Sequence, residues 1–184
     1  MGKNLLAEID RIRRDAELLY DEQAITNAVH GMAARITAQL AGTDPLVICV
    51  LNGGLMLTGW LTAKLDFPLQ LDYVHATRYR GATQGGDLQW IARPQTSLEN
   101  RTVLLIDDIF DEGLTLASLV QACRELGARE VRTAVLVRKL HDRATRQLTP
   151  DFTGLTVPDR YVFGCGMDYK HYLRNLPAIY ALRD

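Results

Sequence analysis

The sequence predicts an α/β fold in which a parallel β-sheet is flanked by helices. Three apolar runs, at residues 46–51, 103–106 and 131–137, have the length and composition of strands that are buried on both faces. Glycine-containing turns and helical patterns follow the first two runs, and successive strand–loop–helix units build a parallel sheet through right-handed crossovers. Since no repeat, low-complexity tract or Gly/Ser linker divides the 184 residues, we expect a single domain over residues 1–184.

Helices are predicted where apolar residues recur every three or four positions. Residues 4–20 have a helical but heavily charged pattern, and residues 22–41 have a clearer one. A third helix is expected to end at about Lys64, and a fourth lies between Gly113 and Gly127. The apolar stripe of the second helix consists of Ile25, Val29, Met32, Ile36 and Leu40.

Composition and charge restrict the class of protein. The chain is 47% hydrophobic and 23% charged, as in ordinary globular proteins, and its net charge of −1 provides no global positive field for nucleic acid. Cys49, Cys123 and Cys165 are predicted to be buried thiols without disulfides, as in a reducing compartment. No signal-peptide pattern and no apolar run of about 18 residues occurs. We therefore expect a cytoplasmic protein with neither a membrane nor a nucleic-acid partner.

Polar segments follow the buried runs at residues 52–54, 107–113 and 138–139. In open parallel sheets, ligands bind beyond the carboxyl ends of the strands, so these segments are expected to meet at one edge. A further strand is expected at residues 69–77, and the glycine-rich stretch 78–87 that follows it is expected to be a long loop.

The segment 104–115 carries the strongest chemical signal. Asp107, Asp108 and Asp111 crowd the end of a strand, just before a helix that begins near Gly113 and Thr115. Adjacent carboxylates suit the hydroxyls of a sugar and Mg²⁺, which prefers oxygen ligands. Backbone N–H groups at the start of a helix suit an anion. The plainer alternative is a capped helix after a buried strand.

Residues 104–115 resemble the phosphoribosyl-pyrophosphate motif of the type I phosphoribosyltransferases, and the other motifs resemble the hypoxanthine-guanine branch of that family. The resemblance extends from about residue 20 to the C-terminus. It implies a type I phosphoribosyltransferase fold: a central parallel sheet, a small hood built from about residues 1–20 and 140–184, and a mobile lid at about residues 78–87. The motifs are Leu51-Asn52-Gly53-Gly54, Val137-Arg138-Lys139, Val157-Pro158-Asp159-Arg160-Tyr161-Val162, Gly164, Asp168-Tyr169 and Arg174-Asn175-Leu176-Pro177.

The resemblance also implies an activity, the transfer of a 5-phosphoribosyl group from phosphoribosyl pyrophosphate to hypoxanthine or guanine in purine salvage. Asp107 and Asp108 would bind the ribose hydroxyls directly or through Mg²⁺, and Asp111 would accept the imidazole proton of the purine. Asn52 and Gly53 would meet the pyrophosphate. The other implied residues are Asp111, Glu112, Gly113, Leu114 and Thr115 around the 5′-phosphate, Arg174 at the pyrophosphate, Lys139, Tyr161, Val162 and Asp168 at the purine, Asp168 at a second metal, and Arg78 and Tyr79 in the lid.

Two departures from the family pattern accompany the resemblance. Glu112 stands where relatives often have threonine beside the 5′-phosphate, so its carboxylate is expected to point away from that site. Arg78 stands before Tyr79 where serine is common. Relatives also hold a non-proline cis peptide before the position of Asn52, so one is expected at Leu51–Asn52.

Other functions stay open at this point. One is transfer to another base, such as xanthine, adenine or uracil, and another is an RNA-binding regulator built on the same fold, against which the balanced charge argues. The signatures G-x-x-x-x-G-K-[ST] and G-x-G-x-x-G are absent, which disfavours other nucleotide-binding folds. A homodimer or homotetramer is the expected assembly. The histidines lack metal-ligand spacing and are predicted to lie at the surface or to be satisfied locally: His30, His75, His141 and His171.

Overall fold

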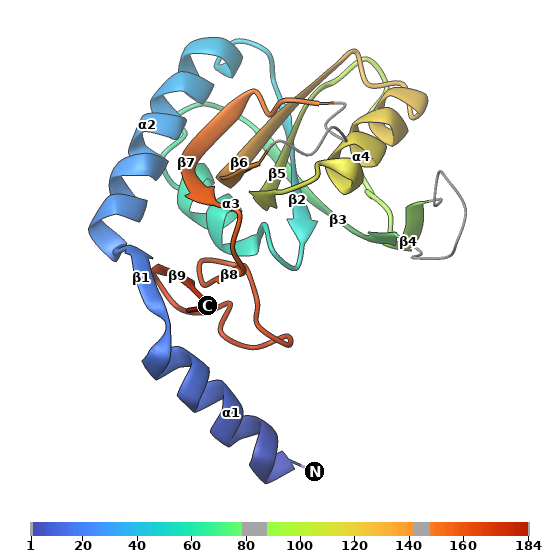
Figure 1. Ribbon diagram of the computed structural model, residues 1–184. Helices are drawn as coiled ribbons and strands as arrows, with labels where there is room; N and C mark the ends of the chain where they lie inside the picture. Colours follow the sequence, from blue (N-terminus) through green and yellow to red (C-terminus); the bar gives the residue numbers. More distant parts are fainter. Residues whose placement is uncertain (1, 79–87, 142–147, 184) are drawn as a thin grey trace.

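A six-stranded sheet forms the centre of the molecule in the computed structural model, which describes residues 2–78, 88–141 and 148–183 (Figure 1). The strand order is β4-β3-β2-β5-β6-β7, and every neighbouring pair is parallel except β3 and β4. The predicted α/β fold with a central, mostly parallel sheet is confirmed. The strands are β2 (Leu46–Leu51), β3 (Gln70–Arg78), β4 (Leu88–Ala92), β5 (Thr102–Phe110), β6 (Glu130–Leu140) and β7 (Phe152–Pro158).

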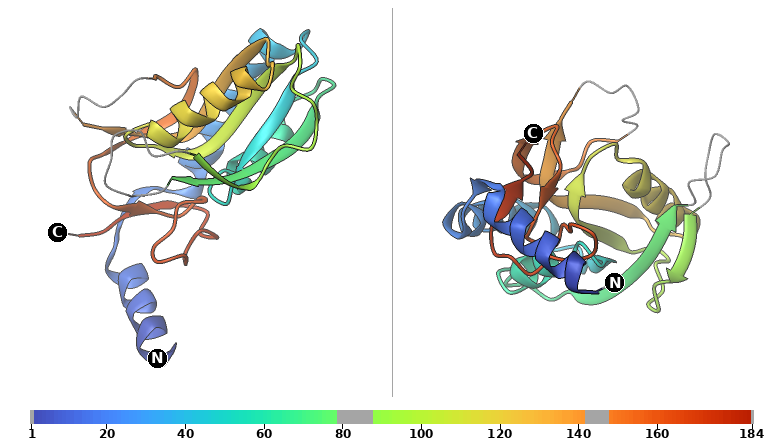
Figure 2. Two further views of the ribbon diagram at one scale, coloured as in Figure 1. Left: turned by 90° about the vertical axis from the view of Figure 1, so that its right-hand side faces the viewer. Right: turned by 60° about the horizontal axis from the view of Figure 1, so that its bottom comes forward.

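Helices cover both faces of this sheet (Figure 2). Successive residues of a strand point to opposite faces, so each central strand supplies two apolar layers. Val47 and Leu104 pack in the cluster that contains α2 and α3, whereas Ile48 and Leu105 pack in the cluster that contains α4. These helices are α2 (Glu22–Leu40), α3 (Leu55–Thr62) and α4 (Leu114–Glu125).

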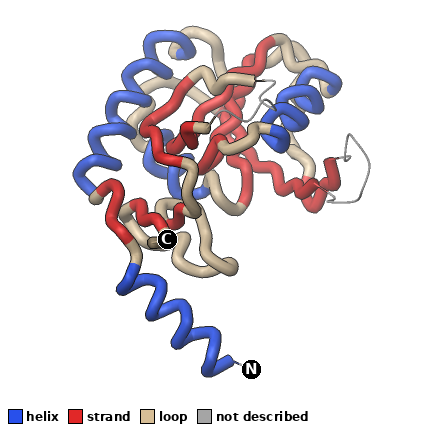
Figure 3. Tube along the Cα trace, in the orientation of Figure 1, coloured by secondary structure: helices blue, strands red, loops and turns tan. Residues whose placement is uncertain are grey.

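A second, three-stranded sheet joins the two ends of the chain in the order β1-β9-β8 (Figure 3). The prediction of helix through residue 20 is wrong in its last turn, because α1 ends at Asp15 and a strand follows. Pairing overrides the local helical pattern there, with Leu18 opposite Tyr180 in an antiparallel ladder. The elements are α1 (Gly2–Asp15), β1 (Glu17–Tyr20), β8 (Val162–Phe163) and β9 (Ile179–Ala181).

The three cysteines are buried and free, as predicted. Burial raises the pKa of the Cys123 thiol to about 11 and that of Cys165 to about 12. Cys165 and Cys123 therefore act as small apolar side chains, one in each of the two core clusters.

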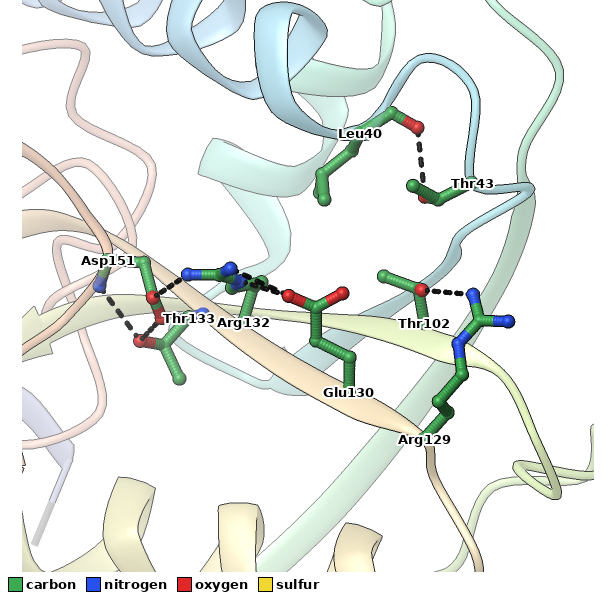
Figure 4. A network of polar contacts seen from close by, with 8 residues as sticks. All are labelled: Leu40, Thr43, Thr102, Arg129, Glu130, Arg132, Thr133 and Asp151. Atoms are coloured by element: carbon green, nitrogen blue, oxygen red, sulfur yellow. Dashed lines mark hydrogen bonds and ion pairs between the residues drawn. The ribbon is translucent and has the colours of Figure 1, made fainter.

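Polar side chains fasten the amino ends of the parallel strands, opposite the edge at which ligands are expected (Figure 4). The carboxylate of Asp151 accepts hydrogen bonds from the Thr133 backbone N–H at 2.8 Å and from Arg132 Nη1 at 2.9 Å. Arg132 also pairs with Glu130 at 2.7 Å. This network fixes the alignment of β6 with the start of β7.

Asp72 in β3 anchors the segment that follows β4. Its buried carboxylate accepts hydrogen bonds from the backbone N–H groups of Tyr73 at 2.7 Å, Gln95 at 2.8 Å and Thr96 at 2.7 Å. Burial opposes ionisation, but these hydrogen bonds outweigh it and lower the pKa of Asp72 below its ordinary value of 3.8. The ionised carboxylate is therefore part of the folded state.

We predict that Asp72→Asn lowers the free energy of unfolding by about 2 kcal/mol at pH 7, because one oxygen no longer accepts these bonds. The pKa of Asp72 in the folded state lies below the ordinary 3.8. The wild type is therefore more stable than Asp72→Asn above about pH 4, and this difference in the free energy of unfolding shrinks as the pH falls through the folded-state pKa. Urea unfolding between pH 3 and pH 7 measures it, with the exposed Asp66→Asn as control. An advantage that does not change with pH would contradict this role.

Candidate active site

The carboxyl ends of the parallel strands border a pocket of about 190 Å³. Six residues singled out from the sequence line it together with Ile109 and Met167. They come from the end of β5 and the residues just after it, from β6, and from the chain in and around β8, which are far apart in the sequence and meet only in the folded protein. The six are Asp108, Asp111, Lys139, Tyr161, Val162 and Asp168.

Asp107 and Asp108 lie together near the end of β5. Asp107 Oδ1 accepts a hydrogen bond from the Asp108 backbone N–H at 2.9 Å, and Asp108 Oδ1 accepts one from the Ile109 N–H at 2.8 Å. Loss of solvent raises the pKa of both carboxyl groups, and the charge of Asp108 raises that of Asp107 further. Ionising both carboxyl groups side by side is therefore unfavourable without a counter-charge, so the pair suits a cation.

The loop after β2 is pressed against this carboxylate pair. The Leu51–Asn52 peptide bond is cis, as expected. A Cβ atom added to Gly53 would lie 2.1 Å from Asp108 Oδ2, so only glycine allows the loop to approach so closely. Gly166 lies close to the same loop, since a Cβ there would lie 2.1 Å from the carbonyl oxygen of Gly53. Asn52 and Gly53 are therefore held next to the end of β5.

Asp111 follows β5 and is joined to the end of β6. Lys139 Nζ lies 2.9 Å from Asp111 Oδ2, and the Lys139 side chain is only 13% exposed. His141 Nε2 lies 3.0 Å from Asp111 Oδ1 and 3.2 Å from the Asp111 carbonyl oxygen. The ion pair across the two strands leaves an acceptor and a donor side by side at the pocket.

Arg174 ties the C-terminal segment to the same pocket. Its Nη2 lies 2.6 Å from Asp168 Oδ1, and its Nη1 donates to the Gly166 carbonyl at 2.5 Å and lies 3.8 Å from Asp108 Oδ2. The second oxygen of Asp168 accepts the His171 backbone N–H at 2.7 Å. Asp168 is thus held in place by a cation and a backbone donor.

Tyr161 forms one side of the pocket and is 48% exposed. Its hydroxyl donates to the Asp168 carbonyl at 2.9 Å, and its ring packs against that of Tyr169 in a T-shaped arrangement with a centroid distance of 5.8 Å. Burial and the nearby charge of Asp168 raise the pKa of Tyr161. An exposed aromatic ring that is held by a hydrogen bond and by a neighbouring ring suits a flat aromatic ligand.

The predicted phosphate-binding segment is a tight turn between β5 and α4. Gly113 has φ of 78°, in the left-handed region that glycine tolerates, and α4 begins with Leu114 and Thr115. Glu112 is exposed to solvent. The first-turn N–H groups of α4 provide donors suited to an anion.

The predicted lid falls mostly outside the described residues. Arg78 is the last residue of β3, whereas Tyr79 and the rest of the segment to residue 87 are not described.

Sequence reasoning missed the contact between His141 and Asp111. His141 is locally satisfied, as predicted for the histidines, but its partner is a residue of the candidate site. Its position two residues after Lys139 could have indicated that both side chains point to the same side, because alternate residues of an extended chain do so.

These features define a pocket with an acidic pair, an anion-binding turn and an aromatic wall, and the chain belongs to the phosphoribosyl transferase domain family, whose profile matches residues 15–170. The hypoxanthine-guanine phosphoribosyltransferase of Bacillus subtilis is 35% identical over 174 residues, which cover 94% of this chain and 96% of that protein. The hypoxanthine-guanine-xanthine phosphoribosyltransferase of Tritrichomonas foetus is 30% identical, with 91% of each chain covered.

Solved structures show the same similarity. A crystal structure of a hypoxanthine phosphoribosyltransferase from Staphylococcus aureus superposes with a TM-score of 0.87 at 29% identity, covering 93% of this chain and 94% of the other. Within the described ranges, no helix of this protein is long and apolar enough to cross a membrane.

We predict that Gly53→Ala lowers the free energy of unfolding by about 1–3 kcal/mol, because its methyl group overlaps the Asp108 carboxylate and forces the loop or β5 to move. Gly59→Ala is the matched control. Nothing lies within 4 Å of a Cβ at that position in α3, so it leaves stability unchanged or raises it by about 0.5–1 kcal/mol. Denaturant titrations compare the two variants, and equal stabilities would contradict the close approach at Gly53.

Proposed function

We propose that the protein transfers the 5-phosphoribosyl group from phosphoribosyl pyrophosphate to hypoxanthine or guanine, giving IMP or GMP and pyrophosphate in purine salvage. The observation that carries the proposal is the Lys139–Asp111 pair, at 2.9 Å, in the same pocket as the acidic end of β5. The names of the relatives from Bacillus subtilis and Staphylococcus aureus support it.

The sugar phosphate is assigned to the loops after β2 and β5. Asp107 and Asp108 bind the ribose hydroxyls, and Asn52 and Gly53 with Arg174 bind the pyrophosphate. The 5′-phosphate binds the backbone of the turn into α4, where the exposed Glu112 is proposed to point its carboxylate away from the phosphate. The residues assigned to the 5′-phosphate in that turn are Asp111, Glu112, Gly113, Leu114 and Thr115.

Mg²⁺ is the proposed cofactor, and the donor set fits it. Among the described residues, no group of three or more His, Cys, Asp or Glu side chains could hold a metal by itself. Asp107 and Asp108 would hold the ion, because their carboxylate oxygens are the kind of ligand that Mg²⁺ prefers. Asp168 is the proposed ligand of a second ion. When bound, Mg²⁺ would supply positive charge that offsets the charge of the departing pyrophosphate.

The purine is assigned to the pocket beneath Tyr161. Lys139 carries only donors, so it pairs with a 6-oxo group and not with the 6-amino group of adenine. Asp111, an acceptor beside it, faces the imidazole edge and takes its proton. Tyr161 stacks on the base, and backbone groups at Val162 and Asp168 meet the C2 side.

Several further assignments accompany this function. The hood consists of about residues 1–20 and 140–184, within a single domain of residues 1–184, and the lid is the segment at about residues 78–87. The protein is proposed to be a cytoplasmic homodimer or homotetramer. Nucleic acid is not a proposed partner, because the net charge of −1 offers no electrostatic attraction to a polyanion.

A second candidate is transfer to xanthine as well, which the name of the Tritrichomonas foetus relative favours. Xanthine carries a carbonyl at C2, which would oppose the backbone carbonyls proposed to meet that side of the base. We therefore expect weak use of xanthine.

The central test is kcat/KM for four bases under one set of conditions. Hypoxanthine and guanine react readily, xanthine reacts weakly, and adenine is rejected by up to about 10⁴-fold, because its amino group leaves Lys139 unpaired. Lys139→Gln, whose amide both donates and accepts, narrows the gap between hypoxanthine and adenine. Adenine matching hypoxanthine in the wild type would remove Lys139 from base selection, and xanthine leading the series would establish the second candidate.

Asp111→Asn tests the proposed base. A general base contributes about 10²–10⁴ in rate, so kcat falls by that order while the fold and the affinity for phosphoribosyl pyrophosphate survive. Steady-state kinetics and calorimetric titration of the sugar phosphate separate the two effects. Near wild-type turnover would exclude Asp111 as the base.

A further inference from the structure

His141 is buried against the residue proposed to accept the purine proton. Its side chain is 3% exposed, whereas that of Asp111 is 38% exposed. One ring nitrogen, Nε2, faces two oxygens of Asp111, the carboxylate Oδ1 at 3.0 Å and the main-chain carbonyl at 3.2 Å. Both are acceptors while the carboxylate is ionised, so Nε2 must carry the hydrogen and donate.

The two carboxylate oxygens of Asp111 are held by different partners. Lys139 Nζ lies 2.9 Å from Oδ2, and His141 Nε2 lies 3.0 Å from Oδ1. In the proposed reaction, Lys139 also donates to the 6-oxo group and must share its hydrogens between the base and Asp111. A rigid, buried imidazole is suited to keep Asp111 oriented while the flexible lysine moves.

The second contact of His141 has a consequence for the main chain. The Asp111 carbonyl lies in the turn assigned to the 5′-phosphate, and His141 follows the strand that carries the base-binding Lys139. One side chain therefore joins the sugar-phosphate side of the pocket to the purine side. A misplacement of about 1 Å between reacting groups can cost about 10²-fold in rate, so this link matters for turnover.

We propose that His141 is a positioning residue that holds the Asp111 carboxylate and its backbone in place for proton transfer; this inference rests on the proposed function. In that step, the attacking purine nitrogen supplies the electron pair of the new bond to C1′. Pyrophosphate leaves with the electron pair of the broken C1′–O bond, and the imidazole proton passes to an oxygen of Asp111. His141 keeps its own proton throughout.

The first experiment compares two substitutions. His141→Leu keeps an apolar side chain of moderate size and removes the donor, and His141→Gln keeps an amide N–H near the position of Nε2. We expect kcat to fall about 10²-fold in His141→Leu, with the KM for phosphoribosyl pyrophosphate changed less than about threefold, and His141→Gln to recover at least about tenfold of the loss. His30→Leu, at an exposed position of α2, is the matched control and keeps wild-type kinetics.

The second experiment places His141→Leu in the Asp111→Asn background. If His141 acts through Asp111, the second substitution causes little further loss, because residues that act as a unit are not additive. A full further loss of about 10²-fold would overturn the proposal. So would wild-type kcat in His141→Leu, or a His141→Gln variant as slow as His141→Leu.

The activity of the wild-type enzyme distinguishes failure of the proposed function from failure of the positioning role of His141. If the wild-type enzyme uses neither hypoxanthine nor guanine, the proposed function fails; if it uses them and the His141 variants are unaffected, only the positioning role fails. Should His141→Leu not fold, His141→Gln is compared with His141→Asn, whose shorter amide does not reach Asp111. Equal kcat in that pair would overturn the proposal.

Discussion

The ion pair between Lys139 and Asp111 is the interaction on which the proposed chemistry depends. It joins the end of β6 to the segment after β5, two strands that run parallel and side by side. A parallel ladder brings the two carboxyl ends to the same edge, so residues that are far apart in the sequence meet without any dedicated loop. A donor and an acceptor are thereby presented next to each other, as the 6-oxo and imidazole edges of a purine require.

The rest of the pocket is held by close backbone approach and by charge. Gly53 and Gly166 bring two loops within touching distance of the end of β5, which no larger residue would permit. Arg174 bridges Asp168, the Gly166 carbonyl and the vicinity of Asp108. Among the described residues, Arg174 is the cation that lies near Asp108, and the proposed metal ion and sugar would bind on the side of the Asp107 and Asp108 carboxyl groups.

Much of the fold was predictable because its signals are local. The buried runs that became β2, β5 and β6 are continuous apolar stretches, and the pockets of parallel sheets lie at their carboxyl ends. The family motifs carried the candidate site, and six of those residues line one pocket. The strand β1 was not predictable, because residues 17–20 continue a helical pattern and become a strand only by pairing with β9, at the other end of the chain. The partner of His141 was missed for a related reason: its spacing from Lys139 indicates only the side to which it points, and its contact with Asp111 depends on how β5 and β6 align.

The most direct measurement is a crystal structure of the protein with IMP and Mg²⁺. We expect Lys139 Nζ within about 3.2 Å of the 6-oxo oxygen, a distance typical of a hydrogen bond, with the Asp111 carboxylate beside the imidazole edge and the purine ring against Tyr161. A purine bound with its 6-oxo group away from Lys139, while Lys139 stays paired with Asp111 alone, would contradict it.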